Sequence, residues 1–513
     1  MTSGRQHPTE PAAAGVPVVG QGRSLLSRPD AQTQVVPLPM RSRGLVSTAG
    51  IVAQGLVRFG YSVIIGRSLP AGFLSATNSA ISTALLASLL WPTSLGAAAA
   101  KFLARESADP ERRAGLMHHL GSWCLATSGL LAVAAGLVTW LWLAPGQAGT
   151  AVLVGLLTVG WSTYTYVRSA HYATQRVLRA TVGDVAALVV AVSGLLVVLA
   201  AGATDLILVP ITVGYLGYAV LGWPRGRRTV LSAELRAEIR GFVGWGVVGS
   251  LTTAGFLQLT MVIARQTGDL RGADAYAAAL TLATPASMVS SVLSLILLPA
   301  LSGAVGRGDV EEARRQTDLA HRGLIVLIGA AFGALVLGAR AVVDVVWPDL
   351  EGAVPVLQIL LLASFLLTSA TACTESLNSM DPTGPRTVGT VRLVGFAVGL
   401  AVLSVSVGTG SVTGIALGYL CGMAVVGLVP FALVWWRQGQ RWRGFTVRVT
   451  TGCALVGGLE TAREQWSPHG GTDLVAVAAF LLLWAALFGG ETARILRPGA
   501  GDGGTRSGVE ATP

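Results

Sequence analysis

Arg58 is the residue whose type and position most strongly suggest chemistry. It lies about 14 residues into an apolar segment, 44–67, and about 13 Å from the outer end of that segment if the segment is helical. A snorkelling side chain covers only part of that distance, and an arginine at this depth costs at least about 2.5 kcal/mol unless it meets water or a partner. A guanidinium binds phosphate or diphosphate through paired hydrogen bonds. Arg58 therefore indicates a diphosphate site; the alternative is an arginine that binds helix-end carbonyls or an acid elsewhere in the chain.

Other polar side chains recur at helical spacing along the same segment, which predicts a polar stripe that lines a cavity. The members of this stripe are Ser47, Gln54, Arg58 and either Tyr61 or Ser62. We expect Gln54 and Tyr61 to assist Arg58 in binding a substrate. The matching position in the second half of the chain falls close to Phe256, so the charge belongs to one half only.

A second polar set lies nearer the cytoplasmic ends of the predicted helices. Its candidates for substrate binding are Arg168, Glu375 and Arg392. Two arginines at this level favour recruitment of an anionic headgroup by electrostatic attraction. The alternatives are anchoring of the basic residues at the cytoplasmic membrane surface and a structural pair between Glu375 and Arg392.

Three further residues carry structural expectations. Asp184 lies just inside an apolar segment, and we expect it to pair with Arg179 or to cap a helix. Pro92 and Pro299 fall in corresponding places near the inner ends of two segments. Paired proline kinks there predict hinges for alternating access, and simple helix termination is the alternative.

Composition assigns the chain to the polytopic membrane proteins. Hydrophobic residues make up 52% of the 513 residues and charged residues only 12%, and the mean hydropathy is +0.63. A soluble chain carries about twice that charged fraction. The net charge of +10 comes from short basic clusters between apolar runs, which suits an anionic membrane surface and argues against nucleic acid as a partner.

Fourteen segments are long and apolar enough to cross about 30 Å of hydrocarbon as helices. They are 44–67, 72–100, 115–143, 149–170, 180–200, 204–223, 241–265, 273–302, 319–347, 353–378, 387–407, 411–436, 445–461 and 473–493. The thirteenth is the weakest, because it is short and contains Arg448 and Glu460. The expected fold class is an all-α polytopic membrane protein with about 14 transmembrane helices.

Landmarks in the first twelve segments repeat in the same order about 200 residues further on, as Arg112-Arg113 and Arg314-Arg315 show. Such a repeat predicts two parallel six-helix bundles around a central cavity, because six spans return the chain to the side from which it entered. The expected divisions are a disordered cytoplasmic tail at 1–40, bundles at 41–223 and 241–437, a cytoplasmic linker at 224–240, an extra helix pair at 438–496 and a second disordered tail at 497–513.

The basic residues also predict orientation. If the amino terminus is inside, about 30 of the 36 basic residues fall on cytoplasmic segments. The outer loops then hold Arg67, Arg265, Arg271, Arg340 and Arg463. We therefore expect a multi-pass protein of the cell (plasma) membrane with both termini in the cytoplasm.

The sequence lacks the motifs of several other functional classes. Cys124, Cys373, Cys421 and Cys453 lie in apolar runs without pairing or metal-ligand spacing, so we expect buried thiols, no disulfide and no metal site. We find no phosphate-binding glycine loop and no nucleophile–base pair, and the predicted loops are short. We expect a protein that is not an enzyme, uses no cofactor and is driven by a gradient or by its substrate.

One motif resembles that of a known superfamily. A first helix that ends in a small residue plus arginine leads through a Leu-Pro turn to small residues and an aromatic. The motif is Ile65-Gly66-Arg67-Ser68-Leu69-Pro70-Ala71-Gly72-Phe73, with a looser echo in Leu270-Arg271-Gly272-Ala273-Asp274-Ala275-Tyr276. Together with the twelve spans plus two, it resembles the superfamily of multidrug, oligosaccharidyl-lipid and polysaccharide exporters, over about residues 41–437. The polysaccharide and lipid-linked oligosaccharide flippases fit best.

This resemblance implies a V-shaped, often cationic cavity through which a polyprenyl-diphosphate sugar passes headgroup first. The added helix pair is similar to that of the peptidoglycan-precursor flippase, where it borders a lipid-tail groove. The implied partners are a lipid-linked sugar, membrane lipids and other polysaccharide-assembly proteins.

Two other functions stay open. A cation-coupled multidrug-type exporter shares the fold, although the first helix here lacks the carboxylate that such antiporters use. A glycan polymerase or ligase normally needs a sizeable outer loop, and the longest outer loop here, around 462–472, is small. We expect flipping by alternating access, with the two bundles rocking against each other.

Overall fold

The computed structural model describes residues 40–106, 109–267, 269–381, 383–408, 410–466 and 471–496. Within these ranges the chain forms helices and no β-strand. The two predicted tails, 1–40 and 497–513, lie outside the described residues except for Met40, so their predicted disorder stays a prediction.

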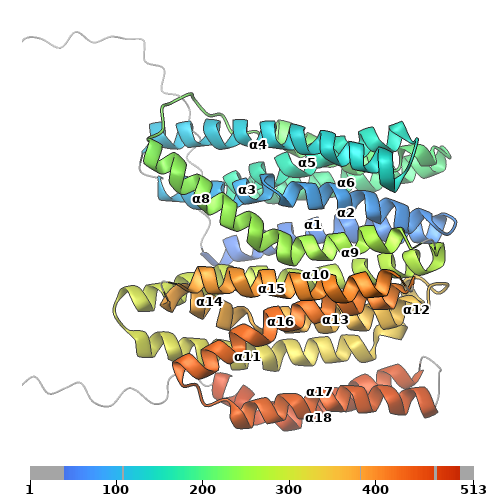
Figure 1. The fold of residues 1–513 in the computed structure, drawn as a ribbon, viewed down its shortest axis with the longest axis vertical. Coiled ribbons are helices and arrows are strands. Elements are labelled where there is room, and N and C mark those ends of the chain that lie inside the picture. The colour runs from blue at the N-terminus through green and yellow to red at the C-terminus, as the bar shows by residue number, and fades with distance from the viewer. Residues whose placement is uncertain are drawn as a thin grey trace, which may run out of the picture. The chain divides into compact units, whose positions relative to one another are not determined.

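A helix or a short series of helices occupies each predicted span (Figure 1). The first half contains α1 (Met40–Ser68), α2 (Phe73–Leu89), α3 (Pro92–Arg105), α4 (Pro110–Val138), η1 (Thr139–Leu143), α5 (Ala148–Ala173), α6 (Val177–Ala200), η2 (Thr204–Leu206) and α7 (Leu208–Gly222). The second half contains α8 (Ala233–Ser250), η3 (Leu251–Gly255), α9 (Phe256–Arg265), α10 (Leu270–Gly306), α11 (Val310–Leu337), α12 (Ala339–Val346), α13 (Ala353–Ser369), α14 (Thr371–Met380), α15 (Gly384–Val407) and α16 (Val412–Gln438). The chain continues with α17 (Arg443–Trp466) and α18 (Gly471–Leu496).

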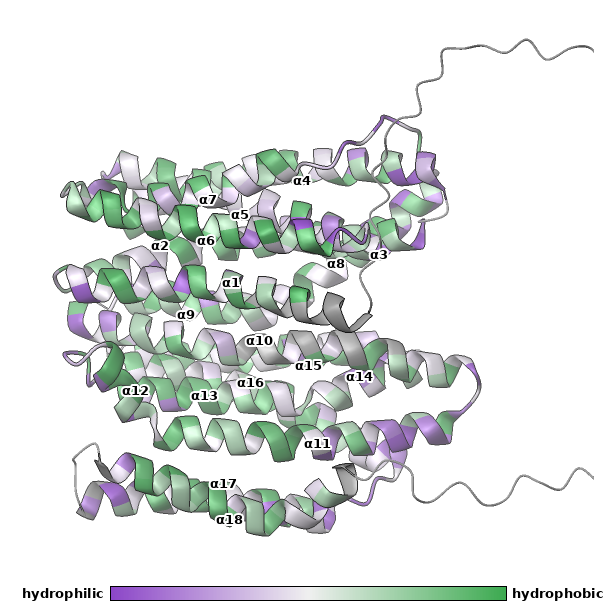
Figure 2. Cartoon of the chain, turned by 180° about the vertical axis from the view of Figure 1, so that it is seen from behind, coloured by the Kyte–Doolittle hydropathy of each residue, from purple (hydrophilic) through white to green (hydrophobic). Residues whose placement is uncertain are grey.

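These helices confirm the predicted class, an all-α multi-pass membrane protein. By length and hydropathy alone, ten helical segments of the described residues qualify as membrane spans, and eleven qualify if the bent pair α2–α3 counts as one span. Hydrophilic residues gather at helix ends and in connecting loops, while the middles of the helices are hydrophobic (Figure 2). This distribution matches a hydrocarbon layer between two aqueous phases.

The repeated arginine pairs mark equivalent helix starts in the two halves. Asp109 caps α4 by accepting hydrogen bonds from the backbone N–H groups of Glu111 and Arg112. Asp309 caps α11 in the same way, by accepting from the N–H of Glu312. In both helices an acid lies in the first turn, where the helix dipole favours negative charge. The sequence repeat is therefore also a repeat of local structure.

The two predicted hinge prolines occupy different settings. Pro92 is the first residue of α3, where its missing N–H costs nothing, and α2 and α3 meet there at a bend of 51°. Pro299 lies inside α10, which continues through it from Leu270 to Gly306. A hinge role for either proline stays a prediction.

Close-packed glycines join α11 to the added helix pair. A Cβ atom at Gly329 would lie 2.3 Å from the ring of Trp484, and one at Gly333 would lie 2.3 Å from the ring of Phe480. Both aromatic side chains are buried and belong to α18. Small residues at GxxxG spacing thus let two membrane helices approach closely, the packing that the spacing suggests.

Charged clusters hold the helix pair at both ends. Near the α17–α18 turn, Arg463 bonds the carboxylates of Glu460 (2.5 Å) and Asp473 (2.8 Å). At the other end, Glu491 of α18 accepts from Arg448 of α17 (2.7 Å). Arg448 and Glu460, the charges that weakened the prediction of a thirteenth span, are therefore paired. At 1.5 Å per residue, the 24-residue α17 is about 36 Å long, which is enough to cross the membrane.

All four cysteines are free thiols. Cys124 and Cys373 are buried, Cys421 is half-buried and Cys453 is exposed. The prediction of burial is therefore wrong for Cys453, because α17 presents that side chain to the open groove beside the second half and not to a packed core.

Replacing Gly333 by valine should separate α18 from α11, because the added methyl groups overlap the Phe480 ring. Overpacking of this kind costs about 1–3 kcal/mol. We expect a lower unfolding temperature in detergent. Gly129→Val in α4 is the matched control, because a Cβ there meets nothing within 4 Å. Equal unfolding temperatures for the two variants would contradict this account of the packing.

Candidate functional site

The two halves of the chain meet along a few helices. α2 packs against α9 and α10, α1 packs against α10, and α3 packs against α8. We term the end of this interface that carries Arg67 and Arg265 the outer end, following the predicted orientation. The end that carries Arg105 and Glu238 is the inner end.

Arg58 lies in this interface and joins the two halves. Its Nη2 atom donates to Gln258 Oε1 of α9 (3.1 Å) and to Ser82 Oγ of α2 (3.3 Å). Gln258 and Ser82 are buried, and Arg58 is half-buried. Both partners are neutral, so neither cancels the charge of the guanidinium. The half-burial and the neutral partners suit a cation that also meets an anionic ligand.

The predicted polar stripe around Arg58 is only partly assembled. Gln54 lies one helical turn before Arg58 and is half-buried. Tyr61 is fully buried, and its hydroxyl donates to the carbonyl oxygen of Ile207 at the start of α7. The Ser62 hydroxyl contacts the side chain of Asn78 (3.1 Å). The structure thus places Gln54 beside Arg58 and engages Tyr61 in packing of the first half; the side chain of Ser47 lies outside the described residues.

Sequence reasoning missed both partners of Arg58. Gln258 is the one side-chain amide in the apolar run 251–265, and it lies two residues after Phe256, the position that matches Arg58 in the repeat. An amide inside an apolar span was the available signal. Ser82 offered no such signal, because serines recur throughout α2.

Arg168 is neutralised by a buried acid. Its Nε atom lies 3.0 Å from Asp184 Oδ2, and the Tyr164 hydroxyl donates to Asp184 Oδ1 (2.8 Å). The Asp184 carboxylate is fully buried. The expected pairing of Asp184 with Arg179 is therefore wrong, because Arg179 points to the end of α7 and donates to the carbonyl oxygen of Leu221. A substrate anion would have to compete with Asp184 for Arg168.

Glu375 and Arg392 face one small cavity in the second half, which Ser290 and Thr371 also line. Glu375 is buried, and its carboxylate accepts a weak hydrogen bond from the Asn378 amide (3.4 Å). The cavity volume is about 20 Å³, which is room for about one water molecule. A sugar headgroup does not fit there in this conformation.

Two helix caps cross the interface at its outer end. The Asp274 carboxylate of α10 accepts from the backbone N–H groups of Gly72 and Ser75 at the start of α2. In the opposite direction, Arg67 of α1 donates to the carbonyl oxygens of Val345 and Val346 at the end of α12. An acid at a helix amino terminus and a cation at a carboxyl terminus are both favourable. Asp274 of the echo thus binds the motif at Gly72, whereas Arg67 of the motif binds the end of α12.

The inner end is also closed, between α3 and α8. Arg105 bonds Glu238 (2.8 Å), and the ring of Phe102 packs edge-on against that of Phe242. Hydrogen bonds from Arg105 lower the pKa of Glu238. The ion pair is therefore complete at neutral pH and is lost only as the pH falls below the usual carboxyl range.

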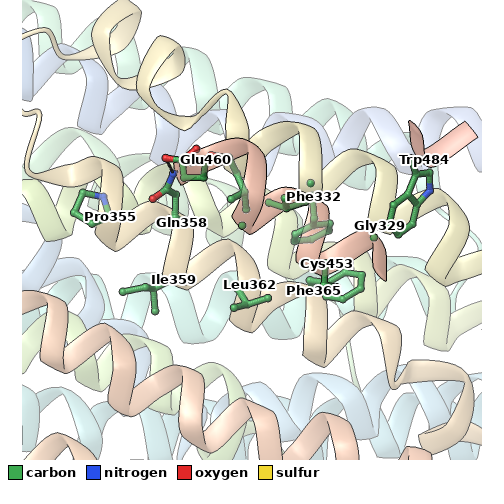
Figure 3. Close-up of a pocket in the computed structure, with 15 residues that line it drawn as sticks. Gly329, Phe332, Pro355, Gln358, Ile359, Leu362, Phe365, Cys453, Glu460 and Trp484 are labelled. Carbon is green, nitrogen blue, oxygen red and sulfur yellow. Dashed lines mark hydrogen bonds between the residues drawn. The ribbon is translucent and has the colours of Figure 1, made fainter. Parts of the chain in front are cut away.

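An apolar groove lies between the second half and the added helix pair (Figure 3). Its volume is about 420 Å³, and α11, α13, α17 and α18 line it. Phe332, Ile359, Leu362 and Phe365 supply much of its wall. Gln358 donates to Glu460 (2.8 Å) within it, and this pair is a polar point in an otherwise hydrophobic lining.

These features define a helical membrane protein whose similar halves meet at a polar interface, with an added helix pair beside a groove. No family model and no curated protein matches the chain. Solved structures do match in fold. The lipid II flippase MurJ in an inward closed conformation aligns with a TM-score of 0.63 and 10% identity, over 88% of this chain and 100% of that chain.

Two other structures carry the same fold. A MATE protein in complex with MaL6 aligns with a TM-score of 0.57 and 14% identity, over 77% of this chain and 95% of that chain. An outward-facing multidrug resistance MATE family transporter of the MOP superfamily aligns with a TM-score of 0.54 and 16% identity, over 77% and 94%. The predicted resemblance to this superfamily is confirmed for the fold.

Asp184→Ala should destabilise the protein by about 3 kcal/mol, because it leaves the Arg168 side chain, which is only 19% exposed, without its acidic partner. The double variant Asp184→Leu/Arg168→Met should recover most of that loss, since no charge stays unpaired. Unfolding in detergent measures both effects. Glu311→Ala, whose side chain is 87% exposed, is the control and should change stability by about 0.5 kcal/mol or less. If the double variant loses at least as much stability as Asp184→Ala, the two residues do not act as a pair.

Asp274→Ala should loosen the outer end, because the first turn of α2 loses its acceptor from the other half. Loss of such a cap costs about 0.5–2 kcal/mol, which is about 2- to 30-fold in population. The readout is the labelling rate of Leu74→Cys by a membrane-impermeant maleimide. Asp269→Ala, which removes a cap within α10 alone, is the matched control. No increase in the Asp274 variant over this control would contradict the role as an outer closure.

Proposed function

We propose that the protein moves a polyprenyl-diphosphate-linked oligosaccharide or polysaccharide precursor across the membrane. The observation that carries this proposal is Arg58, a half-buried guanidinium in the interface between the halves, bonded to two neutral side chains. A diphosphate is a group that such a cation binds well, through paired charge-assisted hydrogen bonds. Arg58 would bind it, and Gln54 and the Gln258 amide would complete the polar contacts.

The added helix pair supports a lipid-linked substrate. The groove beside α17 and α18 is hydrophobic and suits an acyl or prenyl chain that stays in hydrocarbon while the headgroup crosses. The structure of MurJ aligns over 88% of this chain, whereas the MATE structures align over 77%. MurJ is by its name a lipid II flippase, and that name supports the lipid-linked class.

Alternating access supplies the mechanism. The crossed caps at Arg67 and Asp274 close the outer end, and the Arg105–Glu238 contact closes the inner end. Transport requires these two sets of contacts to open in turn, because both ends of the interface are closed in this conformation. Separation of the halves at Arg58 would free its donors from Gln258 for the diphosphate.

The proposal includes a setting for this activity. The protein would act in the plasma membrane with both termini in the cytoplasm, beside other polysaccharide-assembly proteins, and without enzymatic chemistry. A lipid-linked sugar made on the inner face would enter there, and the basic residues on that side would attract its diphosphate.

A cation-coupled multidrug-type exporter is the second candidate. The likeness to MATE structures and two buried acids, Asp184 and Glu375, favour it. Against it, Asp184 is engaged by Arg168, and a cation would have to displace that guanidinium. A cationic dye expelled from proteoliposomes by an imposed sodium or proton gradient, without any lipid-linked sugar, would favour this second function.

Arg58→Ala should slow translocation at least about tenfold, since a hydrogen bond to a charged group contributes about 1.5–3 kcal/mol. The measurement is the rate at which a polyprenyl-diphosphate oligosaccharide in proteoliposomes becomes accessible to an impermeant glycosidase. Arg58→Lys should also lose activity, because an ammonium group does not reproduce the paired hydrogen bonds. Arg271→Ala, an exposed arginine of the outer end, is the control. A wild-type rate for Arg58→Ala would rule out this role.

A further inference from the structure

A separate pocket opens at the outer end of the first half, away from Arg58. Four elements build it: the start of α2, the turn between η1 and α5, the segment around η2, and the end of α9. Its volume is about 300 Å³, at the lower end of the range for small-molecule sites. We term it the rim pocket. Sequence analysis did not point to it, because its walls come from four segments that lie far apart along the chain.

The lining of the rim pocket holds one acid, one base and several neutral polar side chains. Gln147 contributes an amide, Asp205 a carboxylate and Arg265 a guanidinium. The Thr150 hydroxyl donates to Gln147 Oε1 (3.2 Å), which orients that amide. One acid offsets one base, so the lining selects neither a phosphate nor a cation by net charge. A neutral ligand rich in hydroxyl groups suits this set, because hydroxyls both donate and accept.

One buried polar group in the pocket lacks a partner. The Ser79 hydroxyl lines the rim pocket, its residue is only 3% exposed, and its oxygen makes no hydrogen bond. A buried hydroxyl without a partner is destabilising, so a ligand that bonds it gains affinity. The aromatic ring of Phe73, the first residue of α2, also lines the pocket. Aromatic and hydroxyl-bonding groups together match the apolar and polar faces of a sugar ring.

We propose that the rim pocket binds one uncharged sugar residue, that of the translocated glycan as it reaches the outer side. The choice of a glycan rests on the proposed function, whereas the pocket and its lining do not. Asp205 and Arg265 would bond ring hydroxyls, and Ser79 would bond one hydroxyl at the base. Arg265 belongs to the second half of the chain, so a bound sugar would contact both halves at once.

The test is saturation-transfer NMR on the full-length protein in lipid nanodiscs. The probes are free glucose, galactose, rhamnose and N-acetylglucosamine at millimolar concentration. At least one should bind, and Asp205→Ala should weaken that binding about tenfold, the loss of one hydrogen bond to a charged group. Thr461→Ala is the control, because it removes an exposed hydroxyl of α17 that bonds only locally.

Ser79→Ala separates a binding role from a structural one. Because the Ser79 hydroxyl has no partner without ligand, its removal should leave the unfolding temperature unchanged or raised while sugar binding weakens severalfold. Binding that neither Asp205→Ala nor Ser79→Ala weakens would overturn the proposal, as would no binding by any of the four sugars. Sugar binding together with absent translocation of the lipid-linked substrate would instead leave the rim pocket standing and reject the proposed function.

Discussion

The organisation of this protein depends on the free-energy cost of leaving a polar group without a partner in hydrocarbon. The charged side chains of the spans discussed above lie between helices, where polar partners replace water. Arg168 pairs with Asp184, Arg448 pairs with Glu491, and Arg463 bonds two carboxylates. Arg58 differs from these, because its two partners are neutral and belong to opposite halves. The anion site proposed at Arg58 depends on the same constraint that places the structural ion pairs.

The polar contacts that close the two ends of the interface between the halves are individually weak. Helix caps of about 0.5–2 kcal/mol close the outer end, and one exposed ion pair with an aromatic contact closes the inner end. Within each half, by contrast, glycines allow helices to pack in direct contact, as Gly399 does against Phe256 and Gly418. Bundles that hold together internally and part at their interface are what rocking requires.

The helix pair α17–α18 is attached to the second half of the chain and lines the apolar groove beside it. Its contacts are with α11, through Trp484 and Phe480 packed on glycines and through Glu491 bonded to Arg322, and with α13, through Glu460 bonded to Gln358. The groove is therefore attached to the second half and would move with it. A lipid chain held there would stay with one bundle while its headgroup meets the residues that both bundles share.

Much of the fold and a smaller part of the candidate site were predictable from the sequence. Hydropathy predicted the spans, because it is a local property of the chain. The orientation inferred from charge placement and the division inferred from the repeat stay predictions. The depth of Arg58 in an apolar run was likewise local. Its partner Gln258 lies 200 residues away, and Asp274 caps a helix that begins about 200 residues earlier, so only tertiary packing brings them together. Tertiary packing also decided that Asp184 pairs with Arg168 and not with Arg179. A hydrogen bond depends on which faces of two helices lie against each other, and the spacing of residues along the chain does not determine those faces.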